Sequence, residues 1–253
     1  MEGPGHVLRE IMQLNARKQY ADAVRMGEEI LVEYPDEKKL RFHVARAYRL
    51  SGETDKALEH LHYVVNTIDE NDVYALHALA EIAIENNQSE RAVYYLQREL
   101  QQAPDSKIAM SVLFDVYMAQ KNFKGAHELG EKLLALPDSK EDPVIFVGMV
   151  RLCLAERNME GAEHYMEKLW NLPGQEKHSH TFGLRVRVFL AQGDREGAKK
   201  VVDELMQEDP ENDVGMVLKG RIAVSEGDMA TAKEMARALG QKPFHPTNML
   251  FMR

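Results

Sequence analysis

The sequence predicts an all-α protein built from seven tandem helical hairpins, and three observations support this fold class. One alanine recurs at nearly constant spacing, a proline follows most of these alanines, and apolar residues repeat at offsets of three and four. Such offsets are typical of an amphipathic α-helix. Because every apolar period found is near the helical value, no β-sheet is expected.

The recurring alanine marks the second helix of each hairpin. The seven copies are separated by 34, 35, 34, 36, 36 and 34 residues and are Ala23, Ala57, Ala92, Ala126, Ala162, Ala198 and Ala232. Two antiparallel helices joined by a short turn approach closely, so a methyl group fits at their crossing. The near-constant spacing therefore predicts seven similar units.

Prolines mark the ends of six second helices, because proline cannot continue a helix. They follow the alanines by eleven or twelve residues and are Pro35, Pro104, Pro137, Pro173, Pro210 and Pro243. The second copy has Asp69 at this position. The two steps of 36 residues predict widened turns at residues 137–143 and 173–180.

A first helix precedes each alanine. Apolar residues there recur at offsets of three and four, as in Val44, Ala45 and Tyr48. Short breaker segments such as Ser51-Gly52 separate the two helices. We predict hairpins over residues 5–36, 37–71, 72–106, 107–141, 142–177, 178–212 and 213–243, followed by a tail at 244–253.

These features resemble the tetratricopeptide repeat, whose pattern is W-x2-L-G-x2-Y, then A-x3-F, then P in a period of 34 residues. The resemblance covers about residues 5–245, but the chain departs from the pattern: the tryptophan position holds Val7, Arg41, Leu76, Met110, Phe146, Phe182 and Met216. Only Gly220 keeps the family glycine. The resemblance implies that residues 1–253 form a single α-solenoid, a right-handed superhelix whose first helices line a concave face. It also implies a non-catalytic protein-protein interaction adaptor or scaffold that holds a partner peptide or helix in that groove.

One stripe of each first helix faces away from the packing side, and the resemblance places this stripe on the concave face. The residues that we expect to contact a partner there are Phe42, Arg46, Arg49, His77, Met118, Arg151, Leu154, Arg187, Leu190 and Arg221. Arginine binds carboxylates through two parallel hydrogen bonds, so arginines beside apolar residues suit a protein or peptide with acidic and apolar side chains. Internal pairing is the alternative, of Arg46 with Glu81 and of Arg151 with Asp115.

Composition and motifs argue against other functions. The chain has 32 basic and 41 acidic residues, and its net charge of -9 disfavours nucleic acid as a partner. No apolar run has membrane-spanning length, so direct membrane insertion is not expected. The phosphate-loop, G-x-S-x-G and H-E-x-x-H motifs do not occur, so neither an enzyme activity nor a cofactor is expected.

Histidine and cysteine spacing predicts no metal site. His60 and His62, two residues apart on a helix, point to different sides and are expected at the surface. His178 and His180 are expected in a turn without further ligands nearby, whereas structural zinc normally has four. Cys153, the only cysteine, falls at a packing position and should be a small buried hydrophobic residue.

Two other interpretations remain open at the level of the sequence. The chain could self-assemble through its end repeats or its tail. Phe244, Leu250 and Phe251 in the tail are expected to cover an apolar surface, either by folding back over the last hairpin or by docking on a second copy. It could also be the repeat portion of a longer membrane-anchored or secretion/assembly protein. A single cysteine suits the reducing cytoplasm, and a soluble periplasmic or membrane-associated location is the alternative.

Overall fold

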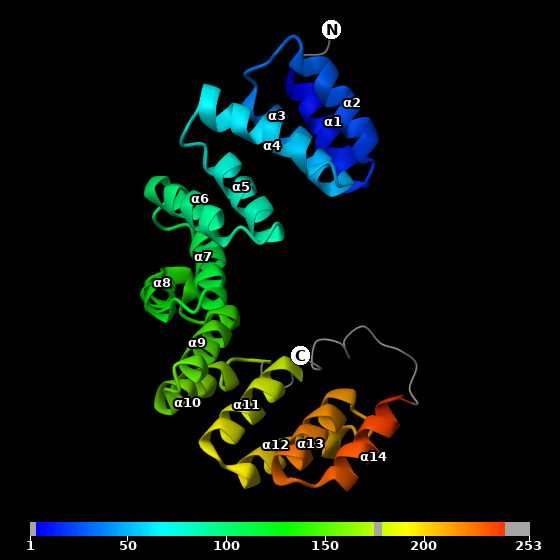
Figure 1. Cartoon of the computed structure of the whole chain (residues 1–253), viewed down its shortest axis with the longest axis vertical. Coiled ribbons are helices and arrows are strands. Elements are labelled where there is room, and N and C mark those ends of the chain that lie inside the picture. Colours follow the sequence, from blue (N-terminus) through cyan, green and yellow to red (C-terminus); the bar gives the residue numbers. More distant parts are fainter. Residues whose placement is uncertain (1–3, 175–178, 241–253) are drawn as a thin grey trace. The chain divides into compact units, whose positions relative to one another are not determined.

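The computed structural model describes residues 4–174 and 179–240, and within those ranges it contains fourteen α-helices and no β-strand (Figure 1). The all-α fold is therefore confirmed. The helices pair as seven hairpins: α1 (Pro4–Ala16) with α2 (Tyr20–Leu31), α3 (Lys38–Ser51) with α4 (Thr54–Tyr63), α5 (Val73–Glu85) with α6 (Ser89–Gln102), α7 (Lys107–Ala119) with α8 (Phe123–Ala135), α9 (Pro143–Ala155) with α10 (Met159–Trp170), α11 (Ser179–Gln192) with α12 (Arg195–Glu208), and α13 (Asp213–Glu226) with α14 (Met229–Gly240).

The chain divides into two compact units, residues 1–129 and 130–253, with the division inside α8. In the first unit, each helix from α1 to α6 packs on its neighbours, and α1 also contacts α3. In the second unit, α9 contacts α11 and α11 contacts α13 in addition to the hairpin contacts. First helices of successive hairpins therefore touch throughout the second unit, as α1 and α3 do in the first. The assignment of all 253 residues to a single solenoid stays a prediction.

The recurring alanines lie at the hairpin crossings. Six of them, from Ala23 to Ala198, have no exposed surface. Ala232 on α14 is half-buried, and α14 has no buried residue. The close approach of the helices that explains the alanines is general: a Cβ atom added to Gly27 on α2 would lie 2.1 Å from Cγ2 of Val44 on α3.

Each hairpin turn contains one residue with a positive φ, five positions before the recurring alanine. These residues are Lys18, Gly52, Asn87, Lys121, Arg157, Gly193 and Gly227. A left-handed residue after a helix lets the following amides bond back to its last carbonyls. In the second hairpin, the Glu53 amide donates to the Tyr48 carbonyl at 2.8 Å and the Gly52 amide donates to the Arg49 carbonyl at 3.1 Å.

The irregular repeat lengths have a structural counterpart. Ala57 precedes Asp72, the N-cap of α5, by fifteen residues, whereas Ala92 precedes Ser106, the N-cap of α7, by fourteen. The extra residue lies in the segment that contains a π-helical turn, η1 (Val64–Ile68), and this wider turn accommodates it. The predicted widening at 137–143 is confirmed and contains the short 3-10 helix η2 (Pro137–Ser139). The second widened turn and the tail lie wholly or partly outside the described residues.

The cores of the two units are aliphatic and local to neighbouring hairpins. In the first unit, Leu40, Val44, Leu61, Leu76 and Leu79 are almost completely buried in one cluster. In the second unit, one cluster surrounds Val150 and Leu169 and another surrounds Ala198 and Leu218. None of the helices in the described ranges is both long and apolar enough to cross a membrane.

Candidate functional site

The candidate site is built from one face of each first helix. On α5, Tyr74, His77, Glu81 and Ile84 follow one another at offsets of three, four and three, which places them on a single side. All ten residues that the sequence assigned to partner contact are exposed or half-buried. Their role in binding stays a prediction.

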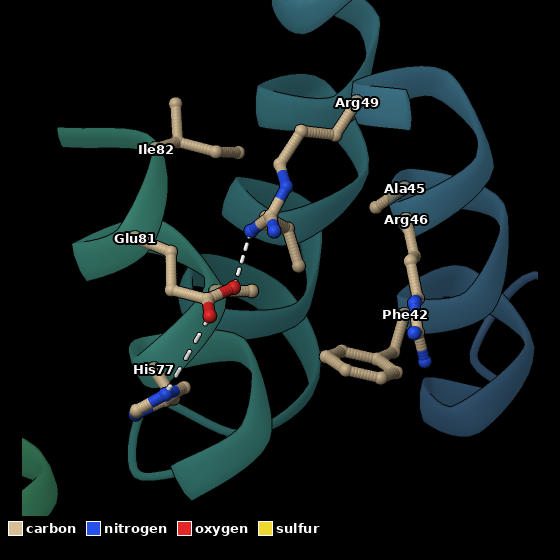
Figure 2. Close-up of a pocket in the computed structure, with 9 residues that line it drawn as sticks. Phe42, Ala45, Arg46, Arg49, His77, Glu81 and Ile82 are labelled. Carbon is tan, nitrogen blue, oxygen red and sulfur yellow. Dashed lines mark hydrogen bonds and ion pairs between the residues drawn. The ribbon is translucent and has the colours of Figure 1, made fainter. Parts of the chain in front are cut away.

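In the first unit, four of these residues come together around a pocket of about 280 Å³ between α3 and α5 (Figure 2). α3 contributes Phe42, Arg46 and Arg49, and α5 contributes His77. The remaining lining is mainly apolar and consists of Ala45, Leu61, Ala78, Glu81 and Ile82. The pocket therefore combines an apolar floor with charged groups at its mouth.

Glu81 neutralises Arg49 and not Arg46, so the predicted pairing of Arg46 with Glu81 is wrong. Figure 2 shows Arg49 reaching from α3 to the carboxylate of Glu81 on α5. Glu85 adds a second carboxylate, whose Oε1 lies 3.8 Å from Arg49 Nε. Within the described ranges, Arg46 has no carboxylate at ion-pair distance.

His77 stands between two carboxylates. Its Nδ1 lies 2.9 Å from Oε2 of Glu99, a residue with 5% exposure, and its Nε2 lies 3.9 Å from Oε1 of Glu81. The hydrogen bond to Glu99 raises the pKa of His77 above its ordinary value, and the charges of Glu99 and Glu81 act in the same direction, against the effect of burial. The imidazolium form of His77 is therefore stabilised in the fold.

In the second unit, three predicted arginines form a row on successive first helices: Arg151 on α9, Arg187 on α11 and Arg221 on α13. Partial burial lowers the pKa of Arg187, and the charges of Arg151 and Arg221 lower it further. The guanidinium group of Arg187 is thus close enough to those of Arg151 and Arg221 to be repelled by both. No carboxylate of the described chain lies at ion-pair distance from Arg187 or Arg221.

Apolar side chains border this arginine row. Leu154 and Leu190, both predicted, are half-buried on α9 and α11, and Val147 is half-buried on α9. Val224 on α13 is 57% exposed. The row therefore offers cationic hydrogen-bond donors next to apolar surface.

Three large apolar residues on the same helix faces escaped the sequence analysis. Tyr74, Ile108 and Val144 are 65%, 67% and 71% exposed and occupy the second position of α5, α7 and α9. Tyr74 also packs edge-on against Phe42, with ring centroids 6.1 Å apart. They lie three, ten and seven residues before His77, Met118 and Arg151, the first predicted contact residue of each helix. Extending the same face to the N-terminal end of each helix would have found them.

His60 is not at the surface, which corrects the sequence prediction. Its exposure is 8%, because it follows Ala57 by three residues and shares the packing face of α4. Nε2 of His60 lies 3.1 Å from Oε1 of Glu28, which also accepts a hydrogen bond from Tyr48 Oη at 2.7 Å. Burial lowers the pKa of His60 despite the nearby carboxylate. This polar cluster joins α2, α3 and α4 inside the first unit.

The predictions for Cys153 and for the histidines His178 and His180 have different outcomes. Cys153 is 2% exposed, which confirms a small buried residue, and burial raises the pKa of its thiol. His180 is the second residue of α11 and so lies in a helix, which corrects its predicted place in a turn, while His178 lies outside the described residues. Over the described ranges, no group of three or more His, Cys, Asp or Glu side chains is arranged to hold a metal ion.

Comparison with known proteins identifies the fold. No family model matches the chain, and no curated protein matches its sequence. A tetratricopeptide repeat protein from Parabacteroides merdae matches with a TM-score of 0.71 and 14% identity, over 98% of both chains. PilF of Pseudomonas aeruginosa matches with a TM-score of 0.65 and 19% identity, over 83% of this chain and 94% of that one. PilW, a type IV pilus biogenesis factor, gives 0.67 and 17% over 85% and 97%. At these identities the likeness establishes the fold.

Proposed function

Because this chain has the tetratricopeptide-repeat fold, we propose that it is a non-catalytic adaptor or scaffold that binds a protein segment along the faces of its first helices. The segment carries acidic and apolar side chains. Binding takes place in the cytoplasm, whose reducing conditions suit the single buried thiol of Cys153.

The arginine row of the second unit is the observation that carries this proposal. Arg187 and Arg221 hold like charges near one another without a carboxylate of the described chain to neutralise them, in a protein with a net charge of -9. Keeping uncompensated like charges together lowers stability, and a partner that supplies carboxylates would relieve the repulsion. Arginine also binds carboxylates with defined bidentate geometry.

The pocket between α3 and α5 supports the same chemistry in the first unit. Arg46 is exposed and lacks an ion-pair partner within the described chain, while Phe42, Leu61 and Ile82 supply apolar walls. An apolar side chain of the partner would fill the pocket, and a neighbouring carboxylate would reach Arg46. Pockets of this type fix orientation through a few polar groups on an apolar lining.

Charge reversal of the arginine row tests the proposal. The variant Arg187→Glu/Arg221→Glu should fold, because Arg187 is exposed and Arg221 is half-buried outside the aliphatic clusters. Affinity for partners captured from cells of the native organism should fall by about 1.5–3 kcal/mol for each charge-assisted hydrogen bond lost. Wild-type affinity should weaken with added salt. Capture followed by mass spectrometry identifies the partners, and circular dichroism checks the melting temperature.

A matched control changes the same charge elsewhere. Arg195→Glu/Lys200→Glu replaces two exposed basic residues of the second helix α12 and should leave capture unchanged. If the arginine-row variant melts like wild type and captures the same partners, the binding site lies elsewhere on the chain.

Self-assembly through the end hairpin is a second candidate, and one observation favours it. α14 contains no buried residue, and its apolar residues Met235, Ala238 and Leu239 are only half-buried. An uncovered end of a repeat stack exposes apolar surface that a second copy could cover. A molar mass that rises with concentration in light scattering would favour this function, and a constant monomer mass would exclude it.

A further inference from the structure

His180 adds a titratable group to the arginine row. It lies on the same face of α11 as Arg187, seven residues earlier, and it is exposed. Side chains on a helix lean toward its N-terminus, so Arg187 extends back toward the first turn, where His180 lies. On this face of α11, His180 and Arg187 are exposed, whereas Gly183 between them is buried. The two cationic groups therefore form the accessible part of this stretch of the helix face.

Among the described residues, the charged groups that act on His180 are basic. Arg151 acts on it from α9 and Arg187 from α11, and within the described chain no charged group of α10, α12 or α13 acts on it. Loss of hydration is the largest cause that lowers the pKa of His180, and the charges of Arg151 and Arg187 lower it further. In the free protein, His180 is therefore predominantly neutral at neutral pH.

We infer that an acidic partner segment seated against His180 and Arg187 on α11 is bound by Arg151, Arg187 and Arg221 together with a proton taken up at His180. This inference rests on the proposed function and adds a regulation to it. Carboxylates placed between the guanidinium groups offset the charges that keep His180 neutral, and they attract the imidazolium directly. The positive end of α11, next to His180, favours the same anion.

The linkage fixes the direction of the pH effect. The pKa of His180 is low in the free protein and higher in the complex, so the complex holds more protons between these two values. Affinity consequently increases as the pH falls through the pKa of the complex, and it becomes constant below the pKa of the free protein. A shift of one pKa unit corresponds to a tenfold change in affinity, so we expect an effect of about threefold to tenfold.

A synthetic acidic probe tests the inference without the natural partner. Binding of a rhodamine-labelled oligoglutamate peptide to the full chain is measured by fluorescence anisotropy at pH 7.5 and pH 5.5. The glutamates stay largely ionised across this range, since their ordinary pKa is about 4.3. The dissociation constant should be about threefold to tenfold lower at pH 5.5. In parallel, the NMR shift of the His180 ring proton should report a higher pKa in the presence of the peptide.

Two histidine variants separate His180 from the other histidines. His180→Gln should bind the peptide with nearly equal affinity at both pH values, whereas His77→Gln, which alters the first unit, should keep the pH dependence. Equal affinities of the wild type at both pH values, or an unchanged His180 pKa on binding, would overturn the inference and leave the proposed function standing. No binding at either pH would overturn both.

Discussion

At the scale of single residues, the hairpin turns carry a cost that the sequence does not reveal directly. Seven turn residues have a positive φ, and four of them, Lys18, Asn87, Lys121 and Arg157, are not glycine. A side chain with a Cβ is disfavoured in this conformation by about 1–2 kcal/mol, whereas glycine adopts it freely. The turn geometry is therefore imposed by the packing of the two helices and tolerated by these side chains.

Replacing one of these residues by glycine should stabilise the protein. Lys121 has φ 57 and is exposed, so Lys121→Gly removes the steric cost and loses no buried contact. We expect the free energy of unfolding to rise by about 1 kcal/mol, measured by urea denaturation. Gly52→Ala, at the equivalent turn with φ 90, should lower it by a similar amount. A glycine variant less stable than wild type would show that the turn is not strained.

The contact between His77 and Glu99 should make part of the stability depend on pH. The folded-state pKa of His77 is raised above 6.5, so its stabilisation is complete below pH 6.5 and is lost as the pH rises through the folded-state value. Burial lowers the pKa values of His43, His60 and His62, so these three histidines make the protein more stable as the pH rises, opposite to His77. The contribution of His77 is therefore isolated by comparison with His77→Gln.

The difference in unfolding free energy between wild type and His77→Gln should reach about 1.5–3 kcal/mol at pH 5.5, as expected for a hydrogen bond to a charged group. It should shrink toward pH 8. Thermal melts at several pH values measure it. A difference that does not change with pH would show that His77 and Glu99 do not interact through charge.

At the scale of elements, stability should follow how many neighbours a helix has. α6 lies between other helices of the first unit and buries Ala92, Leu96 and Glu99, whereas α14 buries no residue. In a repeat stack each hairpin gains its stability mainly from adjacent hairpins. The end helix is thus the first element expected to open.

Hydrogen exchange should detect this gradient. Amides of α14 should exchange faster than those of α6 at the same pH and temperature, because local opening of α14 exposes little apolar surface. Mass spectrometry of peptides from the two helices measures the rates. Equal protection of α14 and α6 would mean that something covers the end of the chain, as in the self-assembly alternative.

At the scale of the whole molecule, the cores are local. The hydrophobic cluster of the first unit draws only on residues between Val7 and Tyr95. Removing the last two hairpins therefore deletes no member of that cluster. A protein in which every contact joins near neighbours can lose its end without losing the rest.

Truncation tests this organisation. A chain that ends at Pro173 should stay folded, with helicity proportional to its length by circular dichroism. A chain that ends at Leu79 should unfold, because it removes α6 and exposes Leu76 and Leu79, which are 0% and 1% exposed in the full chain. Loss of all helicity on truncation at Pro173 would contradict a stack of nearest-neighbour units.

The sequence by itself determined the all-α class, the seven hairpins and the face of each first helix that holds the candidate site. These features are local, because the helical period, the alanine at the crossing and the proline at the helix end all lie within the sequence of one repeat. The π-helical turn η1 and the left-handed residues Lys121 and Arg157 carry no such mark, since their conformations follow from the packing around them.

Only the tertiary structure decided which charged groups meet. Arg46 and Arg49 lie on one face of the same helix, and both are long enough to approach Glu81, but only Arg49 does so. Exposed ion pairs differ by about 0–1 kcal/mol, which is too little for residue type or spacing to select between them. In the same way, His60 shares the packing face of α4 with Ala57, and the structure shows that its ring meets Glu28 on α2 there. Helical spacing decides which residue faces the packing side, whereas the neighbouring helix decides which group that residue meets.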